Sequence, residues 1–95
     1  MAGPIPIHDK IPVSDSAVIL APARVSRRSM VIFNDSDERL YVKFEADVAT
    51  NDFTSMIEPN WQGRMPWGGV YQGTVWGVWA AADPGRFAQV TELVG

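Results

Sequence analysis

The chain has 95 residues, which is enough for one domain with a modest core and too few for a two-domain enzyme with a cleft between its domains. It contains no cysteine and one histidine, so disulfides, thiolate metal sites, cysteine nucleophiles and sites built from two histidines are excluded. Eight basic and eleven acidic residues give a net charge of −3, which argues against a nucleic-acid-binding face.

No targeting or membrane segment is evident in the sequence. Residues 1–6 contain no basic residue and no unbroken apolar stretch, so they do not resemble a secretory signal. The longest apolar runs are far shorter than the ~20 residues that span a bilayer. We therefore expect a protein that is made in the cytoplasm and has no membrane partner.

Residues 1–16 form a segment distinct from the rest. Proline recurs in it without periodicity and favours extended backbone, because its ring holds φ at about −65° and it has no N–H to donate. An extended arm is predicted rather than a helix, with two interpretations: a disordered tail, or an arm that lays apolar side chains on a neighbouring subunit. The side chains available for such an interface are Ile5, Ile7, Ile11 and Val13, which lie among Pro4, Pro6 and Pro12.

From residue 17 onward the pattern predicts one all-β domain, residues 17–95. Apolar or alternating runs are separated by clusters of turn formers about every ten residues. Residues 83–86, Asp-Pro-Gly-Arg, predict a turn in which proline sets the first corner and Gly85 takes a positive φ. Six to seven strands with no helix favour a single antiparallel β-sandwich or small barrel. The predicted strands are residues 17–20, 29–33, 40–45, 53–57, 61–65, 70–80 and 87–94.

Two of these strands, residues 29–33 and 40–45, predict a hairpin across the polar turn between them. Apolar and polar side chains alternate in the second strand, so Leu40, Val42 and Phe44 are expected to face the core. The residues expected to face outward are Tyr41, Lys43 and Glu45.

Four tryptophans fall within nineteen residues of one another. A regular strand at residues 70–80 places Trp76 and Trp79 on opposite faces, so at least one of them faces away from the main core. An indole on that face can be covered by the loop at residues 60–69, can anchor a protein interface or can stack on a sugar ring. The candidates for an interface or a ligand platform are Trp61, Trp67, Trp76 and Trp79.

The inventory of catalytic side chains is nearly empty. His8 is the only histidine, and a mobile arm cannot hold a general base as accurately as catalysis requires. Three acidic residues share the turn at residues 34–38, where capping of the turn and a weak cation site are the two alternatives to catalysis. These residues are Asp35, Asp37 and Glu38. We expect no catalytic residue, no metal and no cofactor.

One basic cluster precedes the predicted strand at residues 29–33. It has two interpretations, a charged contact surface for a partner or a solvated strand edge, since charged residues often protect an edge strand from pairing. The cluster consists of Arg24, Arg27 and Arg28.

Several short motifs follow one another in a particular order: Arg27-Arg28-x-x-Val31-x-Phe33-Asn34-x-Ser36, Leu40-Tyr41-Val42-Lys43, Glu58-Pro59-Asn60, Tyr71-x-Gly73-x-Val75-Trp76-Gly77-Val78-Trp79, Gly85 and Val90-Thr91-Glu92. In this order the chain resembles small β-sandwich proteins encoded among the structural genes of tailed bacteriophages. The resemblance covers about residues 24–94 and leaves the arm unmatched. It implies a virion component, either a capsid decoration protein or an accessory of the neck or tail, and it implies no catalytic residue.

Taken together, these observations favour a non-enzymatic structural protein of a virion. It would be made in the host cytoplasm, would associate with itself and with other virion proteins, and would bind no nucleic acid. The alternative is a carbohydrate-binding module that uses exposed tryptophans.

Overall fold

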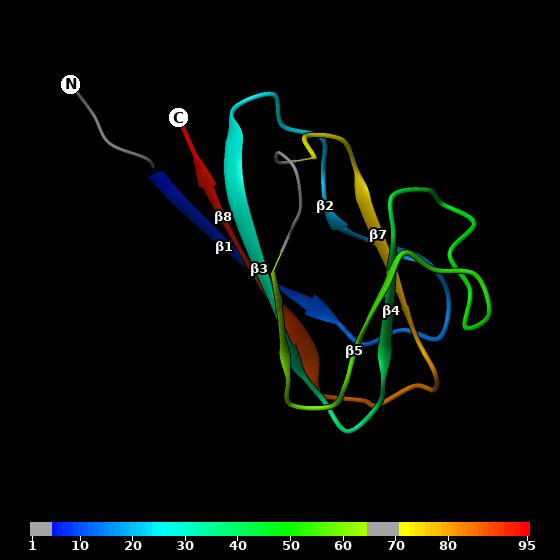
Figure 1. Ribbon diagram of the computed structural model, residues 1–95. Coiled ribbons are helices and arrows are strands. Elements are labelled where there is room, and N and C mark those ends of the chain that lie inside the picture. The colour runs from blue at the N-terminus through cyan, green and yellow to red at the C-terminus, as the bar shows by residue number, and fades with distance from the viewer. Residues whose placement is uncertain (1–4, 65–70) are drawn as a thin grey trace.

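The computed structural model describes residues 5–64 and 71–95, and within these ranges the chain is all-β (Figure 1). The two antiparallel sheets pack as a sandwich, which confirms the predicted fold class. No helix in the described ranges could cross a membrane. The strands are β1 (Ile5–Pro12), β2 (Val18–Ala21), β3 (Arg27–Asp35), β4 (Leu40–Lys43), β5 (Ser55–Ile57), β6 (Gln62–Arg64), β7 (Val75–Trp79) and β8 (Phe87–Val94).

Each sheet has four strands. Sheet A has the order β1-β8-β3-β6, and sheet B has the order β2-β7-β4-β5. The chain passes from one sheet to the other at every connection except the one between β4 and β5. This strand order is that of a double-sheet jelly roll, in which two Greek keys are wrapped around one core.

The predicted hairpin of β3 and β4 is wrong, because the two strands lie in different sheets. β3 pairs with β8 and β6, whereas β4 pairs with β5 and β7. The polar turn between them crosses from sheet A to sheet B. Alternation in a sequence shows which side chains share a face, but it does not show which strand lies alongside.

The N-terminal segment is extended, as predicted, and most of it is the edge strand of sheet A. β1 pairs with β8 from Ile5, opposite Val94, to Pro12, opposite Phe87. This strand brings the number in the described ranges to eight, where six to seven were predicted.

The prolines of β1 lie where the sheet does not need a donor. Val13, directly after β1, donates its N–H to the carbonyl oxygen of Arg86 at 3.1 Å. Backbone groups alternate in direction along an antiparallel strand, so the odd-numbered residues of β1 face β8 and the even-numbered ones face solvent. Pro6 and Pro12 are both even-numbered, and a proline is tolerated at an edge strand when its nitrogen points away from the ladder.

The main core lies between the sheets. Gly77 of β7 leaves room for the Leu20 side chain of the adjacent strand β2, because a Cβ at this position would lie 2.6 Å from Cδ1 of Leu20. The buried residues of this cluster are Leu20, Ala21, Met30, Ile32, Leu40, Val42, Ile57, Val75, Trp79, Ala88 and Val90.

A second, smaller cluster lies on the outer face of sheet B. Tyr41 and Val78 are buried there together with Val48, and Trp76 packs against them half-buried. Val48 belongs to the loop at residues 44–54, which we call the sheet B lid. Tyr41 was expected to be exposed; it points away from the main core as predicted, but the sheet B lid buries it.

Two turns of similar geometry lie between the sheets. In the predicted turn at residues 83–86, Arg86 donates its N–H to the carbonyl oxygen of Asp83 at 3.2 Å, and Gly85 has a φ of 81°, which confirms the prediction. In the turn at residues 58–61, Trp61 donates to the carbonyl oxygen of Glu58 at 3.1 Å, and Asn60 has a φ of 59°. Both turns place proline at the first corner and a residue that tolerates positive φ at the second.

Candidate functional site

The outer face of sheet A carries an apolar surface, formed by alternate residues of β3 and β8. Ile32 of β3 and Val90 of β8 belong to the main core. Side chains alternate along a strand, so the residues on either side of Ile32 and Val90 point to the opposite face. Leu93 is 38% exposed, and the other members are partly exposed. None of them belongs to either buried cluster of the described residues. We call this surface the sheet A face; its apolar members are Val31, Phe33, Phe87 and Leu93.

Polar side chains cross the sheet A face between the apolar ones. His8 Nδ1 lies 2.7 Å from Thr91 Oγ1, so the histidine of the arm is fixed on β1 but remains exposed. Gln89 Nε2 donates to Asp35 Oδ2 at 3.0 Å, and Lys10 Nζ lies 5.7 Å from the ring centre of Phe87. The face therefore mixes apolar and polar groups, as in protein interfaces with apolar anchors among polar groups.

The tryptophans do not form one platform. Trp79 is buried in the main core, and Trp76 lies against the small cluster under the sheet B lid. This confirms the prediction that one of the pair faces away from the main core. Trp61 is 66% exposed, and Trp67 lies outside the described residues.

Trp61 borders a shallow groove of about 250 Å³ at the side of the sandwich where β5 and β6 are the edge strands. Met56 is also partly exposed there. Gly63 leaves room for the Ile57 side chain beside the groove, since a Cβ there would lie 2.7 Å from Cδ1 of Ile57. The remaining lining residues are Ser55, Glu58 and Gln62.

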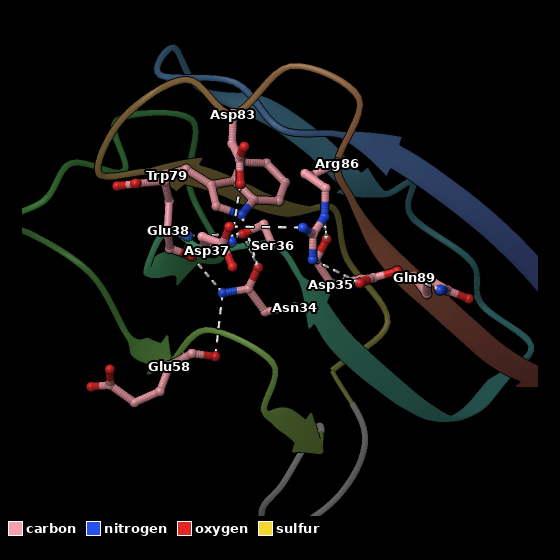
Figure 2. Close-up of polar contacts among 10 residues, drawn as sticks. All are labelled: Asn34, Asp35, Ser36, Asp37, Glu38, Glu58, Trp79, Asp83, Arg86 and Gln89. Atoms are coloured by element: carbon pink, nitrogen blue, oxygen red, sulfur yellow. Dashed lines mark hydrogen bonds and ion pairs between the residues drawn. The ribbon is translucent and has the colours of Figure 1, made fainter.

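The turn at residues 34–38 is built around a buried neutral cluster, which Figure 2 shows in detail. The Asn34 side-chain oxygen accepts hydrogen bonds from Ser36 Oγ at 2.7 Å and from Trp79 Nε1 at 3.0 Å. Its Nδ2 donates to the carbonyl oxygens of Glu38, Ile57 and Glu58 at 2.8, 3.1 and 3.3 Å. Asn34 thereby ties the β3–β4 turn to the β5–β6 turn and to β7.

The acidic residues of the same turn face arginine rather than one another. Arg86 Nη2 lies 3.3 Å from Asp35 Oδ1, and Arg86 Nη1 lies 3.8 Å from Asp37 Oδ2 (Figure 2). Asp37 donates its backbone N–H to Asp83 Oδ2 at 3.0 Å. Glu38 contributes its carbonyl oxygen to the Asn34 cluster. Among the described residues no group of three or more acidic or histidine side chains could hold a metal ion.

The arginine cluster is not a surface patch, because Arg27 is buried, with 1% of its area exposed. Arg27 Nε donates to Glu92 Oε1 at 2.6 Å, and its terminal nitrogens donate to the carbonyl oxygens of Tyr71, Gly73 and Pro22. Arg24 Nε donates to the other oxygen of Glu92 at 3.0 Å.

Of the three arginines, Arg28 is the exposed one, and its Nε donates to the carbonyl oxygen of Gly95. Both sequence interpretations, partner surface and solvated edge, are therefore wrong for Arg27. Its partner Glu92 lies 65 residues away in the chain, which no local pattern shows.

The apolar residues of the arm divide into two groups. Ile11 and Val13 pack against the main core of the same chain. Ile7 is partly exposed, and Ile5 is 56% exposed at the start of β1. Among these four residues Ile5 therefore presents the largest fraction of its side chain to the surroundings.

Charged contacts fix the start of the sheet B lid. Lys43 Nζ lies 2.8 Å from Asp47 Oδ1 and 3.0 Å from Asp52 Oδ2. The hydrogen bonds to the two carboxylates raise the pKa of Lys43 above its ordinary value, and the bond from Lys43 lowers the pKa of Asp47. At the opposite end of β4, hydrogen bonds with Tyr41 and Glu58 raise the pKa of Arg39.

Comparisons with protein-family models, with curated proteins and with solved structures found no match for this chain. The candidate site is therefore defined by its geometry alone.

Sequence reasoning did not select the sheet A face as a site. The signal was present, because alternation in residues 87–94 places Phe87 and Leu93 on one face. What the sequence did not contain was the pairing of β8 with β3, which brings Phe87 and Leu93 beside Val31 and Phe33.

Proposed function

We propose that this chain is a non-enzymatic structural protein of a tailed-phage virion, a capsid decoration protein or an accessory of the neck or tail, which acts by protein–protein assembly. The observation that carries the proposal is the apolar surface of the sheet A face. Val31, Phe33, Phe87 and Leu93 remain partly exposed there. On the outer face of sheet B the lid buries Tyr41 and Val78, while Ile19 and Met56 stay exposed. An apolar sheet face of this kind is typical of a surface that another protein covers.

The size of the face limits how tightly one copy can bind. Three strands of eight or nine residues and the three-residue β6, about 4.8 Å apart and at roughly 3.4 Å per residue, present an area of roughly 450 Å². A standard interface buries about 800 Å² on each partner. One face is therefore expected to give weak binding, and a regular lattice or an additional contact between copies would be needed for stable retention.

Particle binding tests the proposal. The gene would be deleted from the phage genome that carries it, and the purified chain would be added back to the deleted particles and measured by co-sedimentation. The Val31→Lys and Leu93→Lys double variant places two charges on the sheet A face without touching either buried cluster, and we expect at least tenfold weaker binding. A matched control, Thr50→Lys with Asn51→Lys on the sheet B lid, is expected to bind as the unmodified chain does. Equal binding by all three, or no binding by any, would contradict the proposal.

Trp61 favours one second candidate, a carbohydrate-binding module. An exposed indole beside a shallow groove with Glu58 and Gln62 could stack on a sugar ring while polar groups bind its hydroxyls. Tryptophan fluorescence, measured against a broad panel of oligosaccharides, separates the candidates. A change that is lost in Trp61→Ala would favour the module, and no change with any glycan would favour assembly.

A further inference from the structure

We infer that β1 is exchanged between copies of this chain, so that β1 of one copy takes the place beside β8 of its neighbour. Exchange matters where copies are held close together, and in that respect the inference rests on the proposed function. The partner at this site is a second copy of the same chain, which contributes the strand that completes sheet A.

The first observation is how β1 is attached. It is an edge strand whose one neighbour in its sheet is β8. Six of its eight residues are exposed, and Ile5 has 56% of its area exposed although it is apolar. Contact with the main core comes only at the C-terminal end of the segment, from Ile11 and Val13. The backbone ladder therefore carries most of the attachment, and such an edge opens more easily than a buried strand.

The second observation is what β1 protects. When β1 leaves, the backbone groups of β8 that faced it, at Ala88, Val90 and Glu92, lose their partners. An unpaired edge of this length binds another strand readily. β1 of a second copy offers the same residues in the same register, so every contact of the closed form is restored between two chains.

The third observation limits the product. Pro6 and Pro12 lie on the outer edge of β1, so that edge lacks two of the backbone donors that a further strand would require. A β1 strand can complete a β8 edge, but its own outer edge is poorly suited to further pairing. Further strands are therefore not expected to add at the outer edge of β1, and exchange is complete when every β8 edge is filled, as in a reciprocal pair or a closed ring.

The hinge is also present. Residues 15–17 are exposed and lie outside any strand, between Ser14, whose carbonyl oxygen accepts the N–H of Trp79 at 2.9 Å, and the start of β2. Three extended residues span roughly 10 Å, which is enough to redirect the arm towards a neighbour without moving β2.

Cysteine pairing tests the exchange directly, because the chain has no cysteine of its own. Lys10 lies opposite Gln89 in the register of β1 and β8, at a pair that does not exchange backbone hydrogen bonds and whose Cα atoms are therefore close. The variants Lys10→Cys and Gln89→Cys would be made in separate chains, mixed, unfolded and refolded together, and oxidised. We expect a covalent heterodimer on a non-reducing gel, with the disulfide between positions 10 and 89 identified by mass spectrometry.

A matched mixture of Lys10→Cys with Thr50→Cys, whose second cysteine lies on the sheet B lid, is expected to give no such dimer. A second measurement adds the deletion of Asp15 and Ser16, which shortens the hinge so that β1 cannot fold back. This variant is expected to move from monomer to dimer or ring in native mass spectrometry.

The inference is overturned if the Lys10→Cys and Gln89→Cys mixture yields no heterodimer at any concentration while both substitutions in one chain give only an intramolecular link. That result would leave particle binding through the sheet A face untouched. Conversely, cross-linking by a chain that does not bind particles would remove the proposed function and leave the exchange.

Discussion

The two ends of the sandwich each bury a polar cluster, and the clusters differ in charge. At one end, Arg27 and Arg24 share the carboxylate of Glu92, so ions are taken out of water. At the other end, Asn34, Ser36 and the Trp79 indole form a neutral cluster. In both clusters, main-chain carbonyl oxygens of the adjacent turns accept most of the remaining donors.

The comparison shows two ways to fix turns that have no regular hydrogen-bond ladder. A guanidinium reaches several carbonyl groups at once, but its burial is costly and depends on the paired carboxylate. An amide has fewer donors and a much smaller desolvation cost. The stability that each of its hydrogen bonds contributes therefore does not depend on a charged partner. We therefore expect damage to the charged cluster to be larger and more dependent on the partner that remains.

The largest effect is expected for Arg27→Met. It removes the Arg27 bond to buried Glu92 and leaves three carbonyl groups without their donor, so the free energy of unfolding should fall by about 3–5 kcal/mol. Urea denaturation followed by tryptophan fluorescence measures the loss. Adding Glu92→Met should restore part of it, because the stranded carboxylate is then removed. The exposed neighbour provides the control, Arg28→Met, and a cost for Arg27→Met no greater than for Arg28→Met would contradict the account of the charged end.

The neutral end is tested by Asn34→Asp, which keeps the shape but replaces the Nδ2 donor that faces three carbonyl oxygens with a carboxyl oxygen. Burial and these oxygens should raise the pKa of the new carboxyl above the ordinary value of about 3.9. The folded variant then holds a proton that the unfolded chain has lost, so its stability falls as pH rises from about 4 until it passes the raised folded-state pKa, by at most about 1.4 kcal/mol per pH unit. Denaturation at several pH values measures this slope. Asn51→Asp on the sheet B lid should add no such slope, and equal slopes in the two variants would exclude the proposed geometry.

Loss of the hydrogen bonds of one neutral hydroxyl group is expected to lower stability by a smaller amount. Ser36→Ala removes the one O–H that Asn34 Oδ1 and the carbonyl oxygen of Glu38 share, and the oxygen that accepts the N–H of Glu38, so it should cost about 1–2 kcal/mol. Thermal unfolding compares it with Ser26→Ala on an exposed turn, which should change stability by less than about 0.5 kcal/mol. A similar small change in both variants would show that Ser36 only fills space.

The smallest effect is expected for charges at the surface, where Lys43 holds the sheet B lid. The lowered pKa of Asp47 means that its contribution is present above the ordinary value of 3.8 and is lost as pH falls through the lower folded-state value. For Lys43, whose pKa is raised, the contribution is present below 10.5 and is lost as pH rises through the higher folded-state value.

Hydrogen exchange at the amides of Ala49 and Asp52, which bond to each other's carbonyl oxygens, measures opening of the lid. Asp47→Asn should speed exchange there at neutral pH without changing global stability measurably. Glu45→Gln on the same loop should not speed exchange at these amides. Equal exchange rates in the two variants would mean that the ion pair between Lys43 and Asp47 does not hold the lid.

The sequence was informative where local chemistry decides the structure. The turn at residues 83–86 depends on one proline and one glycine, and the placement of Trp76 and Trp79 depends on the two-residue period of a strand. It was uninformative where distant segments meet. Nothing near Arg27 indicates that Glu92 lies beside it, and nothing in residues 34–38 indicates that the next strand enters the other sheet.

The N-terminal strand lies between these two cases. Prolines at positions 6 and 12 weaken the prediction of a strand, but their even spacing is compatible with an edge strand whose outer side needs no donors. Whether such a segment is a tail or part of a sheet depends on the presence of an unpaired neighbour. That neighbour, β8, is formed by residues at the far end of the described chain.

The position of β8 also sets the order in which the protein can mature during synthesis. β8 lies between β1 and β3, yet it is made after both of them. While ribosomes are still adding residues 87–94, β1 and β3 have no strand between them, and the apolar inner surface of sheet B has only an incomplete covering. Because such long-range pairing is slow, we expect nascent chains of this protein to depend on a holding chaperone until β8 has left the exit tunnel.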